Sequence, residues 1–278
     1  MGCYGLVFTS SKSHFTTVIS ALIMVVAAAL TVFAGPAAAA PVAAPIANPS
    51  VHLQGAPNAR TFAGYTTTDG RLVSPTLLIR SDNLASLTPS DVAVLRQRKV
   101  GSIIDLRTVV ERAVQPDRPI PGATVTVHDV LSTTAPATLV DLNSAYRAFV
   151  LDPGSRLAIG NTVRQIARQA AQGKVTLFHC SAGKDRTGWV SAVLLTLLGV
   201  DRAKVEQDYL DSNTYRHTSA ADRLNGVNAS WLRSSFALAD QRYGSFAGYA
   251  ARGLGLTDGD LNALRDALLV PMTPRVSR

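Results

Sequence analysis

Short apolar runs alternate with segments of helical apolar spacing along most of the chain. Four of the short runs predict strands, because each is brief, rich in apolar residues and bounded by polar segments: 76–80, 101–107, 124–130 and 174–178. Five longer segments repeat their apolar residues at helical intervals and predict helices: 87–99, 139–151, 155–173, 187–200 and 258–269. This alternation predicts an α/β domain with a mostly parallel central sheet flanked by helices.

Two of these helices have recognisable ends. Thr88 and Pro89 are typical of an N-cap and a first helical residue, and Asp91 lies near the positive end of the helix dipole. Gly173 closes the segment 155–173. The last 75 or so residues also read as mainly helical, and within them 205–250 fits either a mobile cover over a site or ordinary packing.

The N-terminus differs in kind from the rest. Lys12 precedes 17 uncharged apolar residues, 18–34, and an alanine-rich exit follows, which is the pattern of a secretory signal peptide. We expect residues 1–39 to be removed, 40–57 to form an Ala/Pro-rich tether and 58–278 to form the catalytic domain of a secreted protein. The alternative is a membrane anchor over 18–34.

Composition narrows the chemistry. Removal of the signal would leave Cys180 as the single cysteine, which favours a free reactive thiol over a disulfide. The histidines show no ligand spacing, so we expect no metal and no cofactor. The net charge of +8 favours anionic partners, including acidic membrane surfaces, but no dense basic run or aromatic-interleaved patch points to nucleic acid.

The stretch "HCSAGKDRTG" (179–188) carries the most specific signal. It leaves a predicted strand and enters a predicted helix, and its small residues Ser181, Ala182 and Gly183 allow successive N–H groups to converge on an anion. Arg186 can bind a phosphate with two parallel hydrogen bonds, and the same positive field favours the Cys180 thiolate. Cys-x5-Arg is the signature of cysteine-dependent phosphatases, and the flanking His and Thr-Gly make chance agreement improbable.

The chain also resembles a known family, the bacterial secreted tyrosine phosphatases of the mycobacterial protein tyrosine phosphatase B type. The resemblance covers roughly 58–269 and rests on the loop and on four further segments: "GYTTTDGRLVSPTLLIRS", "RSDNLASLTPSDVAVLRQRKVGSIIDLRT", "VEQDYLDSN" and "GLGLTDGDLNALRDALL". It implies the cysteine-phosphatase fold. The entry "RTFAGY" (60–65) departs from the family pattern of Arg-Asp, a hydrophobic residue and two glycines, so Thr61 and Ala63 leave the role of that segment open.

These features suggest a role for each loop residue. Cys180 is the expected nucleophile, and Arg186 the group that binds the phosphoryl oxygens. His179 is expected to orient the loop and tune the thiolate. Thr187 either donates to the thiolate or caps the helix.

Two aspartates are the main candidates for the group that gives a proton to the leaving group. Asp105 ends a predicted strand at the edge where Cys180 also lies, and the resemblance favours it; its alternative role is to pair with Arg107. Asp185, inside the loop as in phosphoinositide phosphatases, is the rival. Asp129 and Asp152 are weaker candidates.

Lys184 bears on the substrate. A second cation in the loop suits ligands with several phosphates such as phosphoinositides, and its alternative is a solvated lysine that only adds to the field. Phosphotyrosine in proteins or peptides is the leading substrate, with phosphoserine, phosphothreonine and phosphoinositides as further candidates. A rhodanese-like sulfurtransferase and an inactive phosphate-binding module are the competing classes.

Overall fold

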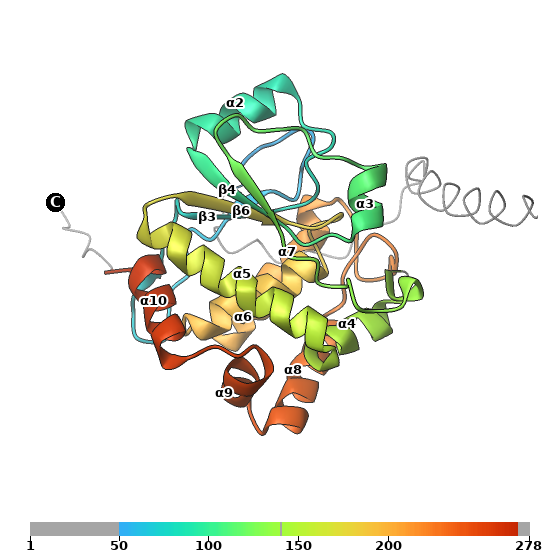
Figure 1. Ribbon diagram of the computed structural model, residues 1–278, viewed down its shortest axis with the longest axis vertical. Helices are drawn as coiled ribbons and strands as arrows, with labels where there is room; N and C mark the ends of the chain where they lie inside the picture. The colour runs from blue at the N-terminus through green and yellow to red at the C-terminus, as the bar shows by residue number, and fades with distance from the viewer. Residues whose placement is uncertain (1–49, 140, 272–278) are drawn as a thin grey trace, which may run out of the picture. The chain divides into compact units, whose positions relative to one another are not determined.

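A five-stranded sheet forms the centre of the domain in the computed structural model, which describes residues 50–139 and 141–271 (Figure 1). Its strand order is β1-β3-β6-β4-β5, where the strands are β1 (Arg60–Thr61), β3 (Leu78–Ser81), β6 (Val175–His179), β4 (Val100–Asp105) and β5 (Thr124–Val127). The four strands from β3 to β5 run parallel, and β1 pairs antiparallel with β3 at one edge. The predicted mostly parallel sheet is confirmed.

The central strands end in register. His179, the last residue of β6, pairs with Ser81 of β3 on one side and with Asp105 of β4 on the other. Ligand sites in parallel sheets gather at the carboxyl ends of the strands. The segment that follows His179 therefore starts at the edge of the sheet where a site is expected.

Helices cover both faces of this sheet, and each strand sends alternate residues to the two faces. In β6, Phe178 joins the larger core and Leu177 the smaller one. The larger core lies on the side of α4 (Leu142–Leu151), α5 (Pro153–Ala171), α6 (Arg186–Leu197), α7 (Arg202–Tyr215), α8 (Ala229–Tyr243) and α10 (Asp258–Leu268). The smaller core lies under α2 (Pro89–Gln97), on the opposite face in Figure 1.

The predicted helices and their ends agree with the structure. Thr88 caps α2 in a capping box with Asp91, and Pro89 is its first residue. Gly173 follows the end of α5 with a φ of +69°, a backbone conformation that glycine adopts without strain. Helix α6 is buried along nearly its whole length, as its apolar sequence predicted.

Several short elements were not predicted. These are α3 (Val109–Val114), a 3₁₀ turn (Pro136–Leu139), α9 (Phe246–Gly248) with the π-helical turn Tyr249–Gly253 after it, and a small sheet of β2 (Leu72–Val73) and β7 (Leu269–Val270). Each is six residues or fewer. The helical ones are too short for a helical apolar period to stand out, and β2 and β7 have only two residues each.

The predicted tether over 40–57 is wrong for its second half. Val51, Leu53 and Ala56 are buried in the smaller core, and Asp91 accepts hydrogen bonds from the N–H groups of Gln54 (2.8 Å) and Gly55 (2.9 Å). The segment was predicted to be a tether because alanine and proline dominate its composition. Its three buried apolar residues lie in an irregular segment and follow no helical or strand period. The predicted signal peptide, its alternative as an anchor and the rest of the tether lie outside the described residues.

The C-terminal helical region packs into the domain. Tyr209 of α7, Leu232 of α8 and Tyr249 are each at most 1% exposed and belong to the larger core. Ordinary packing therefore describes this region, and a mobile cover stays a prediction. Within the part of the chain that the structure describes, no helix is both long and apolar enough to cross a membrane.

Candidate active site

The predicted loop connects β6 to α6 at the carboxyl edge of the sheet. Cys180, 2% exposed and unpaired, begins it, and Arg186 is the first residue of α6. Gly183 has a φ of +65°, and a Cβ there would lie 2.6 Å from the backbone oxygen of Ser81. Only glycine satisfies both conditions, because the loop folds tightly against the end of β3.

The carbonyl groups of the loop point outward, because surrounding side chains donate to them. Asn83 donates to Ser181 O through its backbone N–H (3.1 Å) and its side chain (2.9 Å). Asn58 and Arg216 both donate to Ala182 O at 3.1 Å, and Arg80 donates to Gly183 O at 2.8 Å.

The N–H groups of the loop are left for a ligand. Those of residues 181–185 donate to no other residue in the described part of the chain. Because the carbonyls are held outward, we expect these N–H groups to converge inside the loop at the N-terminus of α6, where the helix dipole also favours an anion. The predicted anion-binding loop thus has outside donors that hold its backbone in place.

Buried charges anchor the donors themselves. Arg80, fully buried, contacts Asp208 of α7 at 2.5 Å, and Arg60 of β1 lies 3.6 Å from the same carboxylate. The entry segment "RTFAGY", whose role the sequence left open, therefore supplies a buried arginine on the side of the sheet where α7 packs. Removing one member of such a pair leaves an uncompensated buried charge.

Arg186 is held by a residue that the sequence analysis missed. Glu111 of α3 accepts from Nη1 and Nη2 of Arg186, both at 2.6 Å, and from Ser181 Oγ at 2.5 Å. Burial alone would raise the pKa of Glu111, but these bonds and the arginine charge lower it to about 2. Glu111 binds the end of the guanidinium and uses two of its five N–H groups, one on Nη1 and one on Nη2. The side of the guanidinium that carries Nε–H is therefore available to an anion.

A signal for Glu111 was present in the sequence. Thr108 and Glu111 have the spacing of a capping box, and in the structure Thr108 caps α3 while Glu111 returns the bond to the Thr108 N–H (3.0 Å). The capping box predicts a helix start. It does not predict which cation the same carboxylate contacts.

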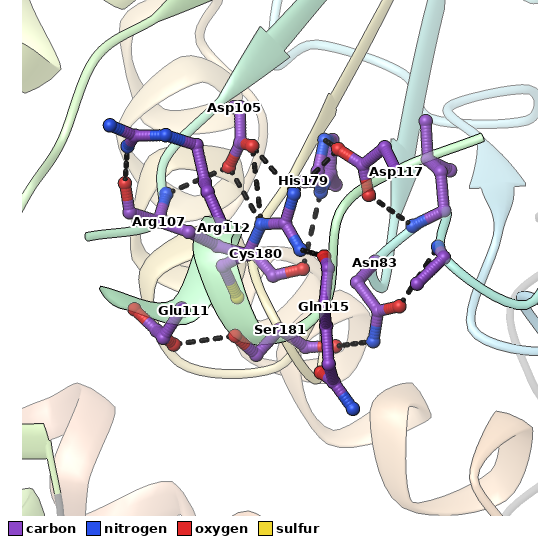
Figure 2. A network of polar contacts seen from close by, with 12 residues as sticks. Asn83, Asp105, Arg107, Glu111, Arg112, Gln115, Asp117, His179, Cys180 and Ser181 are labelled. Carbon is purple, nitrogen blue, oxygen red and sulfur yellow. Dashed lines mark hydrogen bonds and ion pairs between the residues drawn. The ribbon is translucent and has the colours of Figure 1, made fainter. Parts of the chain in front are cut away.

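His179 belongs to a polar network behind the loop (Figure 2). Its Nδ1 lies 3.2 Å from Cys180 O, and its Nε2 lies 3.2 Å from Oδ2 of Asp117. Arg107 contacts Asp117 at 2.6 Å and Asp105 at 2.7 Å. This arrangement fixes the ring against the start of the loop, as an orienting role requires.

Asp105 is fully engaged in that network. Both its oxygens accept from the Arg107 guanidinium, and Oδ1 also accepts from the Arg107 N–H at 2.9 Å. The residue is 1% exposed, and neither oxygen contacts the loop among the described residues. The geometry therefore favours the alternative role of Asp105, as the partner of Arg107, over that of proton donor.

The other carboxylates have different surroundings. Asp185 lies within the loop, where Oδ1 accepts from Tyr146 at 2.9 Å and Oδ2 lies 2.9 Å from Lys184 Nζ. Asp129 is half-buried after β5, and burial raises its pKa against the opposing charges of Arg186 and Arg112. Asp152 caps α5 through Ser155 N at 2.7 Å. Asp185 alone of these is part of the loop that holds Cys180.

Two further loop residues are placed clearly. Lys184 is 3% exposed, so its interpretation as a solvated lysine is wrong. Thr187 is fully buried inside the first turn of α6, its hydroxyl has no partner in the described part of the chain, and it makes no cap bond. Neither of the two predicted roles of Thr187, a bond to the Cys180 sulfur or a cap on the helix, is made in this structure.

One cluster could hold a metal by its ligand atoms, since those of Asp105, Asp117 and His179 lie within 4.8 Å of one another. The Arg107 guanidinium already contacts both carboxylates. A second cation there would face that positive charge at close range. The cluster is therefore better described as an ion-pair network than as a metal centre.

A central parallel strand that leads through a Cys-x5-Arg loop into a buried helix is the arrangement of a cysteine-dependent phosphatase. The model of the tyrosine phosphatase family matches residues 51–270, and the chain belongs to that family.

The chain is also similar to several individual proteins. The triple specificity protein phosphatase PtpB of Mycobacterium tuberculosis is 27% identical over 78% of this chain and 98% of its own. A tyrosine-protein phosphatase of Nostoc commune is 31% identical over 73% of this chain and 74% of its own. The crystal structure of TpbA from P. aeruginosa aligns with a TM-score of 0.36 at 19% identity, over 65% of this chain and 88% of that one.

Proposed function

We propose that the protein hydrolyses phosphotyrosine through a cysteinyl-phosphate intermediate. The observation that carries the proposal is the loop geometry: carbonyls bound by outside donors, N–H groups of 181–185 without a partner among the described residues, Cys180 at the start and Arg186 at the end. This arrangement fits a phosphoryl dianion beside a thiol.

In the first step, the Cys180 thiolate attacks phosphorus, and the bond from phosphorus to the tyrosyl oxygen breaks. Asp185 gives a proton to the departing phenolate. The loop N–H groups and the free edge of Arg186 stabilise the charge on the equatorial oxygens. The buried Thr187 hydroxyl, which has no hydrogen-bond partner among the described residues, would have to turn toward the sulfur to stabilise it as it leaves in the second step.

In the second step, water attacks the phosphocysteine and the sulfur–phosphorus bond breaks. Asp185, now ionised, takes a proton from the water, so that thiolate, aspartic acid and inorganic phosphate are regenerated. The choice of Asp185 over Asp105 rests on position and access. Asp185 lies in the loop and its side chain is 18% exposed, whereas the side chain of Asp105 is 2% exposed and both its oxygens bind Arg107.

The test is hydrolysis of para-nitrophenyl phosphate by residues 40–278 in the presence of EDTA. We expect turnover by the wild type and a loss of at least about 1,000-fold for Cys180→Ser, because the alcohol is far less ionised at neutral pH. Phosphate or vanadate binding without turnover would instead favour the inactive binding module. Sulfur transfer from thiosulfate to cyanide would favour the rhodanese-like class.

The substrate range is a second part of the proposal. Phosphotyrosine peptides are the leading substrates, and phosphoserine, phosphothreonine and phosphoinositides are further candidates. Lys184 lies in the loop, which supports multiply phosphorylated ligands, although its ion pair with Asp185 already uses part of its charge. Wild type and Lys184→Ala compared on phosphopeptides and on soluble phosphoinositides would show whether lysine selectively supports the latter.

We also propose that the protein is exported, on the strength of the apolar segment 18–34 and its alanine-rich exit. N-terminal sequencing of the protein from the culture medium should start near residue 40. Recovery of the intact chain in the membrane fraction would favour the anchor and, with it, contact with a membrane surface.

A further inference from the structure

Two buried tyrosines connect the packed helices to the loop. Tyr146 of α4 is 2% exposed and Tyr209 of α7 is fully buried, and their hydroxyl oxygens lie 2.5 Å apart. The Tyr146 hydroxyl also lies 2.9 Å from Oδ1 of Asp185. These two side chains therefore form a short chain of polar atoms that ends on the loop carboxylate.

The chemistry of the two phenols decides which hydroxyl donates to which acceptor. Burial, and next the charge of Asp185, raise the pKa of Tyr146 well above its ordinary value, so the phenol keeps its proton. Each phenol has a single O–H. Because Tyr146 donates its hydrogen to Asp185, Tyr209 must donate to Tyr146, and the two bonds strengthen each other.

In Asp185, the hydrogen bond to Tyr146 takes the place of the usual N-cap hydrogen bond. An aspartate at an N-cap normally accepts from the backbone of its own helix, as Asp141, Asp152 and Asp201 do here. Asp185 occupies the N-cap of α6, yet makes no cap hydrogen bond. Its carboxylate is directed to Tyr146 and Lys184 instead, and the stabilisation that a cap would contribute is given up.

Gly188 provides independent support. A Cβ at this position in the first turn of α6 would lie 2.9 Å from the ring of Tyr209, closer than real contacts allow. Glycine in the "RTG" motif thus lets the Tyr209 ring pack against the helix that begins at Arg186. The ring of Tyr146 is fixed in turn by Phe149 and Trp231, with ring centroids 5.2 and 6.0 Å away.

We propose that Tyr146, supported by Tyr209, is a positioning residue that orients the Asp185 carboxylate for proton transfer to the leaving group. The inference rests on the proposed function, in which Asp185 is the proton donor. Lys184 contacts the other oxygen as a compact point charge, which sets little direction, so the packed aromatic pair is what defines the direction of the carboxylate.

The test compares kcat/KM for phenyl phosphate, whose leaving group needs a proton, with kcat/KM for para-nitrophenyl phosphate, whose leaving group needs one much less. We expect Asp185→Asn to lower the ratio of the two strongly. Tyr146→Phe should lower it by about 10-fold, part of the full effect of a general acid. Tyr209→Phe should lower it less, in the same direction.

Tyr249→Phe is the matched control. Tyr249 is as buried as Tyr146, but its hydroxyl donates to Phe149 O at 2.8 Å and does not contact the loop, so its removal should leave the ratio unchanged. Thermal unfolding of each variant checks the fold. If Tyr146→Phe does not fold, Tyr209→Phe carries the test.

The possible outcomes distinguish a failure of the proposed phosphatase activity from a failure of the role proposed for Tyr146. A wild type that hydrolyses neither ester refutes the phosphatase itself. An active wild type with an unchanged ratio in Asp185→Asn overturns the inference but not the phosphatase. A lowered ratio in Asp185→Asn together with equal losses on both esters in Tyr146→Phe assigns the tyrosine a purely structural role, and also overturns the inference.

Discussion

At the scale of single residues, the roles of the carboxylates near the loop follow from what each one contacts. Glu111 holds the terminal nitrogens of Arg186, Asp105 holds Arg107, and Asp185 lies within the loop. The sequence predicted the loop residues themselves, because the Cys-x5-Arg spacing and its small residues encode the anion site directly. It could not rank the carboxylates, because their partners come from segments far apart in the chain.

Glu111→Gln tests whether the glutamate positions Arg186 or blocks the phosphate site. The variant keeps the size of the side chain and loses its charge. We expect kcat/KM for para-nitrophenyl phosphate to fall about 10- to 100-fold, because a guanidinium without its anchor is misplaced for the transition state. A competitive inhibition constant for inorganic phosphate completes the measurement: tighter phosphate binding in the variant would instead mean that Glu111 blocks the site.

The same pair gives a prediction for pH. The pKa of Glu111 is about 2 in the folded protein and near 4.5 when unperturbed. Because the folded value is depressed, its stabilisation is fully present above about pH 4.5 and is lost as the pH falls through about 2. Urea unfolding should therefore show a difference of about 2 to 3 kcal/mol between wild type and Glu111→Gln at pH 7, which narrows on acidification. A difference that is constant with pH would contradict the pairing.

At the scale of elements, the long helices and the four central strands were predicted well, and the short helices were not. Helices α5, α6 and α10 agree with their predicted ranges within a few residues, because their apolar spacing extends over several turns. Helix α3 was missed: it has six residues, none of them buried, and Val109, Val110 and Val114 are exposed. The position of α3 depends on its N-cap and on the Glu111–Arg186 ion pair. Neither of these interactions can be predicted from the spacing of apolar residues.

That dependence can be measured by hydrogen exchange. A short helix without buried residues is marginal alone, so its amides should exchange through local opening. In Arg186→Ala, we expect the amides of α3 to exchange about 10-fold faster than in the wild type, which corresponds to about 1.4 kcal/mol. The amides of α5, buried in the larger core, serve as the internal reference. Equal rates for α3 in both proteins would show that the ion pair does not hold the helix.

At the scale of the whole molecule, the segment before β1 joins parts of the fold that the sequence treated as separate. Val51 and Leu53 fill the smaller core beneath α2, and Asp91 of α2 accepts from the backbone of Gln54 and Gly55. Asn58, the next polar residue, donates to Ala182 O in the loop. The prediction of a tether rested on the average composition of residues 40–57. Burial depends on individual side chains, such as Val51 and Leu53, and an average does not detect them.

Two truncations of the chain test this connection. A protein that starts at residue 50 should match one that starts at residue 40, whereas one that starts at residue 58 should lose about 3 to 6 kcal/mol, since burial of a valine and a leucine contributes about 1.5 to 3 kcal/mol each. Urea unfolding measures the difference. The residue-58 protein should also bind phosphate more weakly, because Asn58 becomes a free chain end and no longer holds Ala182 O in place. Equal free energies of unfolding for all three proteins would support the original prediction that residues 40–57 form a tether.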